Sequence, residues 1–256
     1  QLVDTDCLTA RQTVLVKDGQ RAATRMYADG DRLQPGMVRA HIEQGYTLSL
    51  RRLHETFPAI ATFCRTLADE LGHPVQANAY RTPPGAQGFR HHWDTHTAVI
   101  AQLAGHKVWE LYRPLVPDPM SPHQNWGLVG FTDEQKAFLA DSVPDRTIAL
   151  SPGDVLWIPR GWVHNPHAPA GPAGPSLHLT FGVLERSRYW LAEQLLVQAA
   201  EDPALRASLP PALASADEVE LVREVRERLV RWLQSLSPEK ARRALPDAPP
   251  DVSAPR

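Results

Sequence analysis

The fold of this chain is decided by ANAYRTPPGAQGFRHHWDTHTAVIAQLAGHKVWELYRP, residues 77–114. Its apolar runs are short, and Gly and Pro separate them. THTAVIAQL, the dipeptide AG and HKVWELY predict two strands joined as a β-hairpin. DVLWIP (154–159) and SLHLTFGV (176–183) predict two more strands. Many short strands with Gly/Pro turns indicate a mainly β fold with a closed or double-sheet architecture.

Helical patterns flank these strands. Apolar residues recur at steps of three and four from Leu53 to Leu71, which predicts an amphipathic helix ending near Gly72. After Arg186 a second helical region begins, and a helix opening at Ser215 carries Val222, Val225, Leu229, Trp232, Leu233 and Leu236 on one face. The predicted organisation is therefore a β domain over 1–186, a helical region over 187–245 and a Pro-rich tail over 246–256.

Composition narrows the class of protein. The chain has 256 residues and no run of eighteen apolar ones, so a membrane span is not expected. Its two cysteines make neither a disulfide framework nor a thiolate metal site, and the cytoplasm is the expected compartment. A net charge of −2 gives no sign of direct nucleic-acid binding. The first residue is Gln, so we expect that native residues precede it.

A candidate metal site lies in GFRHHWDTHTAV. Side chains two apart on an extended strand share a face, so His92 and Asp94 point together. His164 follows the strand DVLWIP and the turn RGW, from where a strand hairpin could return it to the same place. Two His and one carboxylate occupy one face of an iron(II) ion and leave three positions open. His91 and His96 compete as ligands, and among eleven histidines an incidental cluster stays possible.

These motifs carry a family resemblance. Residues 77–114, SPGDVLWIPRGWVHNPHAP (151–169) and SLHLTFGV (176–183) closely resemble the Jumonji-C oxygenases of the ribosomal oxygenase, cupin-like branch. The resemblance implies a double-stranded β-helix (jelly-roll) with N-terminal helices and a C-terminal helical dimerisation region. It implies an enzyme that uses iron(II), 2-oxoglutarate and dioxygen to hydroxylate a side chain at its β-carbon. His or Arg in a ribosomal protein is the expected acceptor, and a homodimer is the expected assembly.

The resemblance also implies roles for individual residues. His92, Asp94 and His164 match the iron ligands, and Lys107 matches the residue that binds the distal carboxylate of 2-oxoglutarate. Without the family, Lys107 could equally be an exposed strand lysine. The substrate-side positions matched are Asn78, Tyr80 and Ser176, each of which could instead make a structural hydrogen bond. The tryptophans within the motifs are interpreted as barrel packing.

Three other functions remain open from the sequence. A hydroxylase that tailors a peptide natural product would suit the Pro/Ala/Arg-rich ending. A catalytically inactive cupin-like binding module is the alternative from another class, against which the intact His92, Asp94, His164 and Lys107 argue. A cupin enzyme without 2-oxoglutarate usually has an His-x-His pair, whereas this chain has His-x-Asp.

Overall fold

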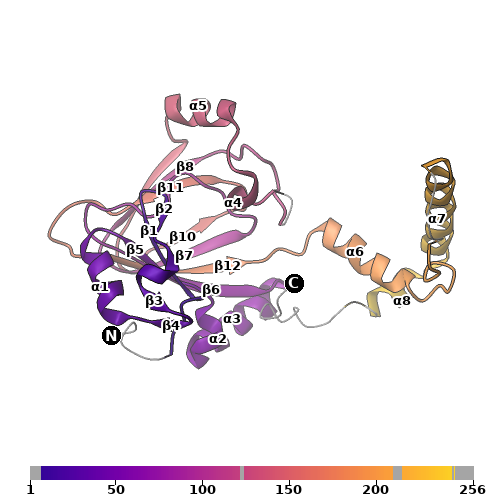
Figure 1. The fold of residues 1–256 in the computed structure, drawn as a ribbon, viewed down its shortest axis with the longest axis horizontal. Coiled ribbons are helices and arrows are strands. Elements are labelled where there is room, and N and C mark those ends of the chain that lie inside the picture. Colours follow the sequence, from indigo (N-terminus) through magenta and orange to yellow (C-terminus); the bar gives the residue numbers. More distant parts are fainter. Residues whose placement is uncertain (1–6, 122–123, 210–214, 244, 246–256) are drawn as a thin grey trace. The chain divides into compact units, whose positions relative to one another are not determined.

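The computed structural model describes residues 7–121, 124–209, 215–243 and 245. The chain forms two compact units, the first ending at Glu185 and the second beginning at Arg186 (Figure 1). The strands belong to the first unit. No helix within the described ranges is long and apolar enough to cross a membrane.

Two antiparallel sheets build the first unit. The seven-stranded sheet contains, in spatial order, β10 (Val155–Ile158), β7 (Thr97–Ala104), β12 (Ser176–Val183), β6 (Val75–Thr82), β5 (Thr47–Leu50), β1 (Thr13–Lys17) and β2 (Gln20–Arg21). The three-stranded sheet contains β11 (Val163–His167), β8 (Lys107–Tyr112) and β9 (Arg146–Leu150). A separate small ribbon pairs β3 (Ala28–Asp29) with β4 (Arg32–Leu33). The mainly β fold predicted from the sequence is confirmed.

The chain crosses from one sheet to the other between β7 and β8, and the strands from β9 to β12 alternate between the two sheets. β7 pairs with β10 and β12, whereas β8 pairs with β9 and β11. The β-hairpin predicted for these strands is therefore wrong, because the turn at Gly105 carries the chain from one sheet to the other. Gly105 has a φ of +59°, and a Cβ there would lie 2.5 Å from the carbonyl oxygen of Pro175. Only glycine fits this turn. Strand crossings of this kind build a double-stranded β-helix.

The space between the sheets is apolar over part of its length. Inward side chains of both sheets pack together there, because alternate residues of each strand face the interior. The buried members of this cluster are Ala98, Ile100, Trp109, Leu111, Leu150 and Ile158. The cavity that holds the candidate site adjoins this cluster, and Ala98, Ile100 and Trp109 belong to both.

Helices cover the outside of the first unit. The predicted helix over 53–71 is broken into α2 (Leu53–Thr56) and α3 (Pro58–Leu71) by an extended Phe57. The residue before a proline avoids the helical region, which explains the break. α3 ends at Gly72 (φ 70°) as predicted, and it buries Cys64 and Ala68 against β6 and β12. The remaining helices of this unit are η2 (Thr24–Met26), α1 (Pro35–Glu43), α4 (Trp126–Val129) and α5 (Asp133–Asp141).

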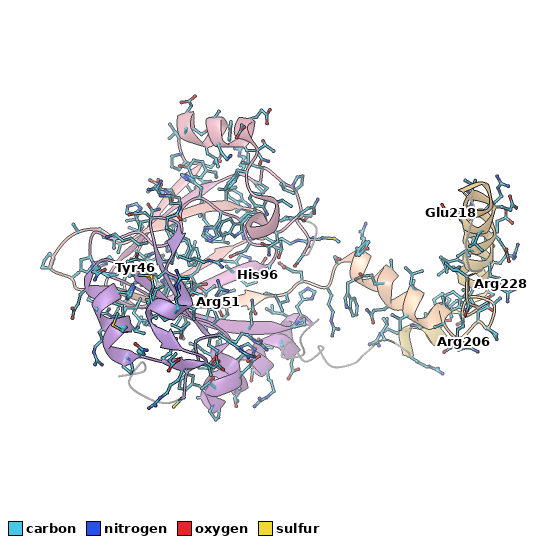
Figure 2. All side chains as sticks on the ribbon, in the orientation of Figure 1. Tyr46, Arg51, His96, Arg206, Glu218 and Arg228 are labelled. Atoms are coloured by element: carbon cyan, nitrogen blue, oxygen red, sulfur yellow. The ribbon has the colours of Figure 1, made fainter. Side chains whose placement is uncertain are left out.

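The second unit is helical, with α6 (Arg188–Ala199), α7 (Ser215–Ser235) and α8 (Pro238–Arg243). Asp202, in the connection after α6, accepts two hydrogen bonds of 2.6 and 2.8 Å from Arg228 on α7. Arg206 donates to the Ala200 carbonyl at 2.8 Å, and Figure 2 shows Arg206 and Arg228 close to this connection. The bonds from Arg228 hold the segment after α6 against α7. Val222 on α7 is still 67% exposed, and Val197 on α6 is 69% exposed.

Candidate metal and cosubstrate site

His92 and His164 are brought together by the sheet itself. They form an isolated antiparallel bridge in which His92 N–H donates to the His164 carbonyl at 3.1 Å and His164 N–H donates to the His92 carbonyl at 2.8 Å. Directly opposed residues project on the same face, so their ring centroids lie 4.1 Å apart. This pairing of β11 with the His92 segment, rather than a hairpin with β10, returns His164 to the site.

The backbone sets the tautomer of both rings. His92 Nδ1 lies 2.7 Å from the Arg90 carbonyl oxygen, and His164 Nδ1 lies 3.0 Å from that of Trp162. A carbonyl oxygen can only accept, so each Nδ1 carries the proton and each Nε2 presents a lone pair. Burial lowers the pKa of His92 to about 3, with a further contribution from His164. His92 is therefore a neutral imidazole, the form that binds a metal.

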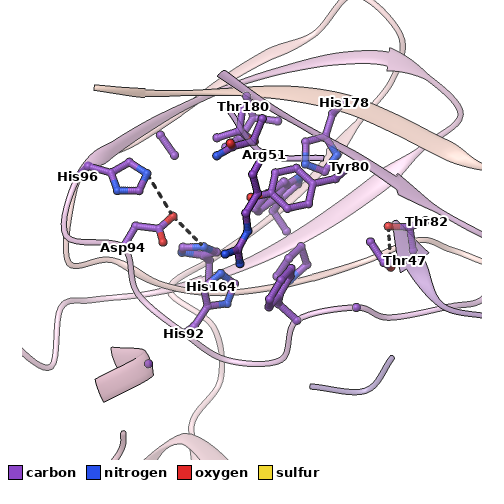
Figure 3. Close-up of a pocket in the computed structure, with 18 of the residues that line it drawn as sticks. Thr47, Arg51, Tyr80, Thr82, His92, Asp94, His96, His164, His178 and Thr180 are labelled. Atoms are coloured by element: carbon purple, nitrogen blue, oxygen red, sulfur yellow. Dashed lines mark hydrogen bonds and ion pairs between the residues drawn. The ribbon is translucent and has the colours of Figure 1, made fainter. Parts of the chain in front are cut away.

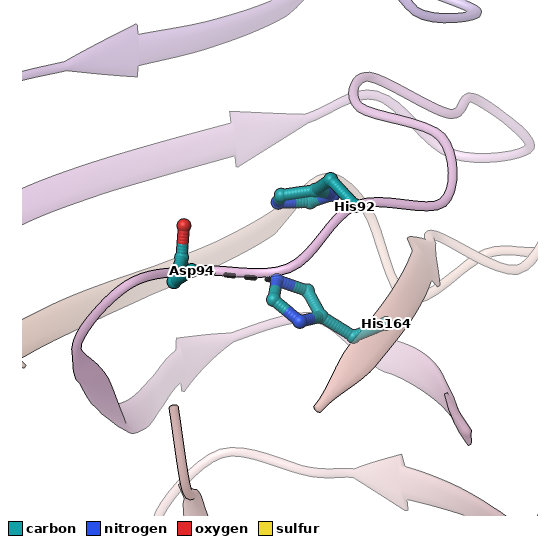
Figure 4. Close-up of side chains that lie close together, drawn as sticks. All are labelled: His92, Asp94 and His164. Carbon is teal, nitrogen blue, oxygen red and sulfur yellow. Dashed lines mark ion pairs between the residues drawn. The ribbon is translucent and has the colours of Figure 1, made fainter. Parts of the chain in front are cut away.

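Asp94 completes the cluster (Figure 4). Its Oδ2 lies 3.8 Å from His164 Nε2, and one donor atom from each of His92, Asp94 and His164 lies within 4.8 Å of the others. Burial alone would raise the pKa of Asp94, but the imidazoles of His96, His164 and His92 outweigh it and lower that pKa. Two imidazole nitrogens and a carboxylate oxygen fit a divalent cation of the iron(II) type.

Lys107 forms a second polar centre at the start of β8. Its side chain is only 3% exposed, and its ammonium donates to Thr82 Oγ1 at 2.8 Å. Burial lowers the pKa of Lys107 to about 7. Within the described part of the chain, the Trp109 indole N–H and His178 Nδ1 are buried without a hydrogen-bond partner. A buried cation beside polar atoms lacking partners fits a bound carboxylate, because such groups are costly to bury alone.

One cavity joins the two centres. Figure 3 shows His92, Asp94 and His164 among the residues that line it. Its volume is about 410 Å³, and it is lined by His92, Asp94, His164 and Lys107 together. Strands of both sheets contribute to it, which is why its walls come from segments far apart in the sequence. A cavity of this size suits a small organic acid beside a metal ion.

The three predicted substrate-side residues differ in position. Asn78 and Tyr80 line the cavity from β6. Asn78 Oδ1 also accepts from the backbone N–H of Arg52 at 3.0 Å, so it has a structural task as well. Ser176 does not belong to the cavity lining: it is buried and its Oγ accepts from Gln102 Nε2 at 3.0 Å. Its position favours the structural hydrogen bond over substrate contact.

Sequence reasoning missed several lining residues. Thr82 on β6 and His178 on β12 face the cavity, and the ring of His178 stacks on Tyr80 at 5.0 Å. Extending the alternation from Tyr80 by two residues would have found Thr82. Trp109 both packs in the core and lines the cavity, so interpreting it as packing alone was incomplete. Arg51, just after β5, also lines the cavity (Figure 3).

The two competing histidines are separated by the structure. His91 is not part of the cavity lining, and its ring packs against Tyr112 at 5.2 Å. His96 does line the cavity, and its Nε2 lies 3.9 Å from Asp94 Oδ2. Among the described residues, the cluster with metal-ligand spacing is formed by His92, Asp94 and His164, without His96.

Known proteins are similar to this chain in sequence. The JmjC domain family model matches residues 52–191. Ribosomal oxygenase 2 of Rattus norvegicus is 29% identical over 239 residues, which cover 90% of this chain and 46% of the relative. The bifunctional lysine-specific demethylase and histidyl-hydroxylase NO66 of Drosophila willistoni is 33% identical over 173 residues, covering 68% of this chain and 21% of the relative.

A solved structure shares the fold. YcfD, a ribosomal oxygenase from Escherichia coli in complex with cobalt and 2-oxoglutarate, superposes with a TM-score of 0.51 at 16% identity, over 95% of this chain and 59% of that one. This chain thus spans less than half the length of the two curated relatives.

Proposed function

This chain belongs to the JmjC domain family, and on that premise we propose that it is an iron(II)- and 2-oxoglutarate-dependent oxygenase. His92, Asp94 and His164 would hold the iron, and Lys107 would hold the distal carboxylate of 2-oxoglutarate. The proposal rests on one observation: the three metal-type ligands and the buried Lys107 line the same cavity, so one small ligand can contact both. A binding module without catalysis would not need this combination.

The relatives support the same chemistry. One carries the name histidyl-hydroxylase, and the E. coli ribosomal oxygenase was solved with cobalt, a divalent ion that can stand in for iron(II), and 2-oxoglutarate. Bound iron would supply the dioxygen chemistry that hydroxylates an unactivated C–H bond while 2-oxoglutarate is decarboxylated to succinate. The chain's own residues orient the reactants and exclude water from the cavity.

Each residue has a task that follows from its surroundings. The carbonyl groups of Arg90 and Trp162 hold the two rings with Nε2 free for the metal. Lys107 provides a positive charge that a carboxylate would complement, and Thr82, already bonded to Lys107, keeps that ammonium in place. The indole N–H of Trp109 is a further donor available to the cosubstrate.

The charge of the cavity bears on the acceptor. Lys107 would be paired with 2-oxoglutarate, and Arg52 is paired with Glu55. The other basic lining residues are Arg21 and Arg51, whereas Asp94 is the acidic residue among the described lining. A guanidinium acceptor would meet like charges, which costs free energy, whereas a neutral imidazole would not. We therefore favour the β-carbon of a histidine over that of an arginine, in a protein that is expected to be ribosomal. With such a substrate we expect the enzyme to act in the cytoplasm.

Two measurements test the function. The purified protein should convert 2-oxoglutarate to succinate in the presence of iron(II), and Asp94→Ala should abolish this turnover while its thermal unfolding remains cooperative. Mass spectrometry of host ribosomal proteins, with and without the gene, should then find a histidine that gains one oxygen atom. Wild-type-like turnover in Asp94→Ala would reject the metal site. Turnover without any modified ribosomal protein would reject only the substrate.

A further inference from the structure

The Asp94 carboxylate faces an imidazole on each side. Asp94 Oδ2 lies 3.8 Å from Nε2 of His164 and 3.9 Å from Nε2 of His96, and Figure 3 shows Asp94 between the two rings. In the described ranges these imidazoles are the two basic groups in ion-pair contact with this carboxylate. His164 belongs to the metal-type cluster, and His96 does not. Of these two imidazoles, His96 is therefore the one that can contact the Asp94 carboxylate without being a metal ligand itself.

The surrounding backbone keeps the His96 ring beside Asp94. A Cβ on Gly182 would lie 2.8 Å from both Cδ2 and Nε2 of His96, so the ring rests where a side chain on β12 would otherwise be. The segment itself is fixed at both ends. Gly161 N–H donates to the Asp94 carbonyl at 2.9 Å, and Thr97 N–H donates to Glu185 Oε2 at 3.0 Å. His96 is therefore oriented before any ligand binds.

We propose that His96 is a positioning residue for the metal site, whose Nε2–H donates to the Asp94 carboxylate. The 3.9 Å separation is about 1 Å longer than a hydrogen bond, and rotation of the carboxylate about its Cβ–Cγ bond can close it. A carboxylate held in this way offers one oxygen to the metal and leaves the other coordination positions open. The inference rests on the metal-binding part of the proposed function and concerns no step of the reaction.

The test is the affinity of the metal-stripped protein for cobalt(II), followed by calorimetry and by the visible absorption of the bound ion. Loss of such an outer partner typically weakens metal binding about 10- to 100-fold, and this loss is expected for His96→Leu. His96→Gln keeps an N–H donor and should restore most of the affinity and the wild-type absorption. Wild-type affinity in His96→Leu would overturn the proposal. Equal losses in both variants would also overturn it, by assigning the effect to ring packing.

A double-mutant cycle provides a second test, in which Gly182→Ala perturbs the site without removing any polar atom. Gly182→Ala should displace the His96 ring and weaken cobalt(II) binding, and it should have no further effect in the His96→Leu background. If Gly182→Ala weakens cobalt(II) binding as much in the His96→Leu background as in the wild type, its effect does not depend on His96 and the proposal is contradicted. His106→Leu, at an exposed histidine, controls for adventitious binding to surface imidazoles. Asp94→Ala distinguishes failure of the His96 inference from failure of the proposed metal site. Unchanged cobalt(II) affinity in this variant would reject the metal site itself.

Discussion

At the scale of single residues, Lys107 is a cation that lies almost entirely out of contact with water. Burial lowers its pKa to about 7, and its ammonium donates to the neutral hydroxyl of Thr82. A dianion bound beside it would favour the charged ammonium and raise that pKa again. Cosubstrate binding is therefore linked to proton uptake.

The linkage predicts a pH dependence of 2-oxoglutarate binding. Below pH 7 Lys107 is already protonated and binding needs no proton. Above pH 7 a proton must be taken up, so the affinity should fall about tenfold per pH unit until the raised pKa of the bound state is reached. Calorimetry between pH 6.5 and 9, in buffers of different ionisation enthalpy, measures both affinity and protons. A constant affinity with no proton uptake would show that Lys107 stays charged in the free protein.

Removing the Lys107 charge gives a separate prediction. Lys107→Ala loses a charge-assisted hydrogen bond, which costs about 1.5–3 kcal/mol, or roughly ten- to a hundredfold in affinity. The apparent KM for 2-oxoglutarate should rise by this factor, while the affinity for cobalt(II) changes little. If 2-oxoglutarate dependence is unchanged in Lys107→Ala, another basic residue, such as Arg51, holds the carboxylate.

At the scale of secondary-structure elements, the turn before β8 determines where Lys107 lies. In Gly105→Ala the added Cβ would clash with the Pro175 carbonyl, and alanine would have to adopt a φ of +59°. In Gly30→Ala alanine would adopt nearly the same φ, +58°, but its Cβ would have no atom within 4 Å. The two variants share the backbone strain and differ in the clash. We expect Gly105→Ala to be less stable than Gly30→Ala by roughly 1–3 kcal/mol. Urea unfolding measures this difference, and equal losses would mean that the Pro175 segment moves freely.

These elements also show which features a sequence can predict. That His92 and Asp94 share a face was predictable because period-two alternation operates within one segment. His164 was a candidate from its place after DVLWIP and RGW, and the family resemblance matched it and added Lys107. The hairpin was wrong because a short Gly-containing turn has the same local sequence whether it joins neighbours in a sheet or crosses between sheets. Pairing is decided by distant strands, such as β12 beside β7. Arg51 lies on a segment with no motif of its own, and in SLHLTFGV the matched position was Ser176 rather than His178, so only the assembled cavity identifies these two residues.

At the scale of the whole molecule, the second unit carries apolar surface on its helices. Its exposed apolar residues on α6 and α7 include Leu191, Leu196, Val197, Val219, Val222, Val225, Val230 and Leu233. A helix of this length is marginal in water unless an apolar face is covered. Exposed patches of this kind mark interaction sites, and a two-fold contact would use the same patch on both subunits. We therefore predict a homodimer formed through residues 187–240.

Light scattering at micromolar concentration tests the assembly. A dimer predicts about twice the single-chain mass of 28.4 kDa. Val222→Glu places a charge on the exposed apolar surface of α7 and should shift the mass toward the monomer, because an unpaired charge in an apolar contact is costly. Gln234→Glu adds the same charge at an exposed polar position and should leave the mass unchanged. A single-chain mass for the wild type would reject the dimer, and a dimer that survives deletion of residues 187–256 would move the interface to the β unit.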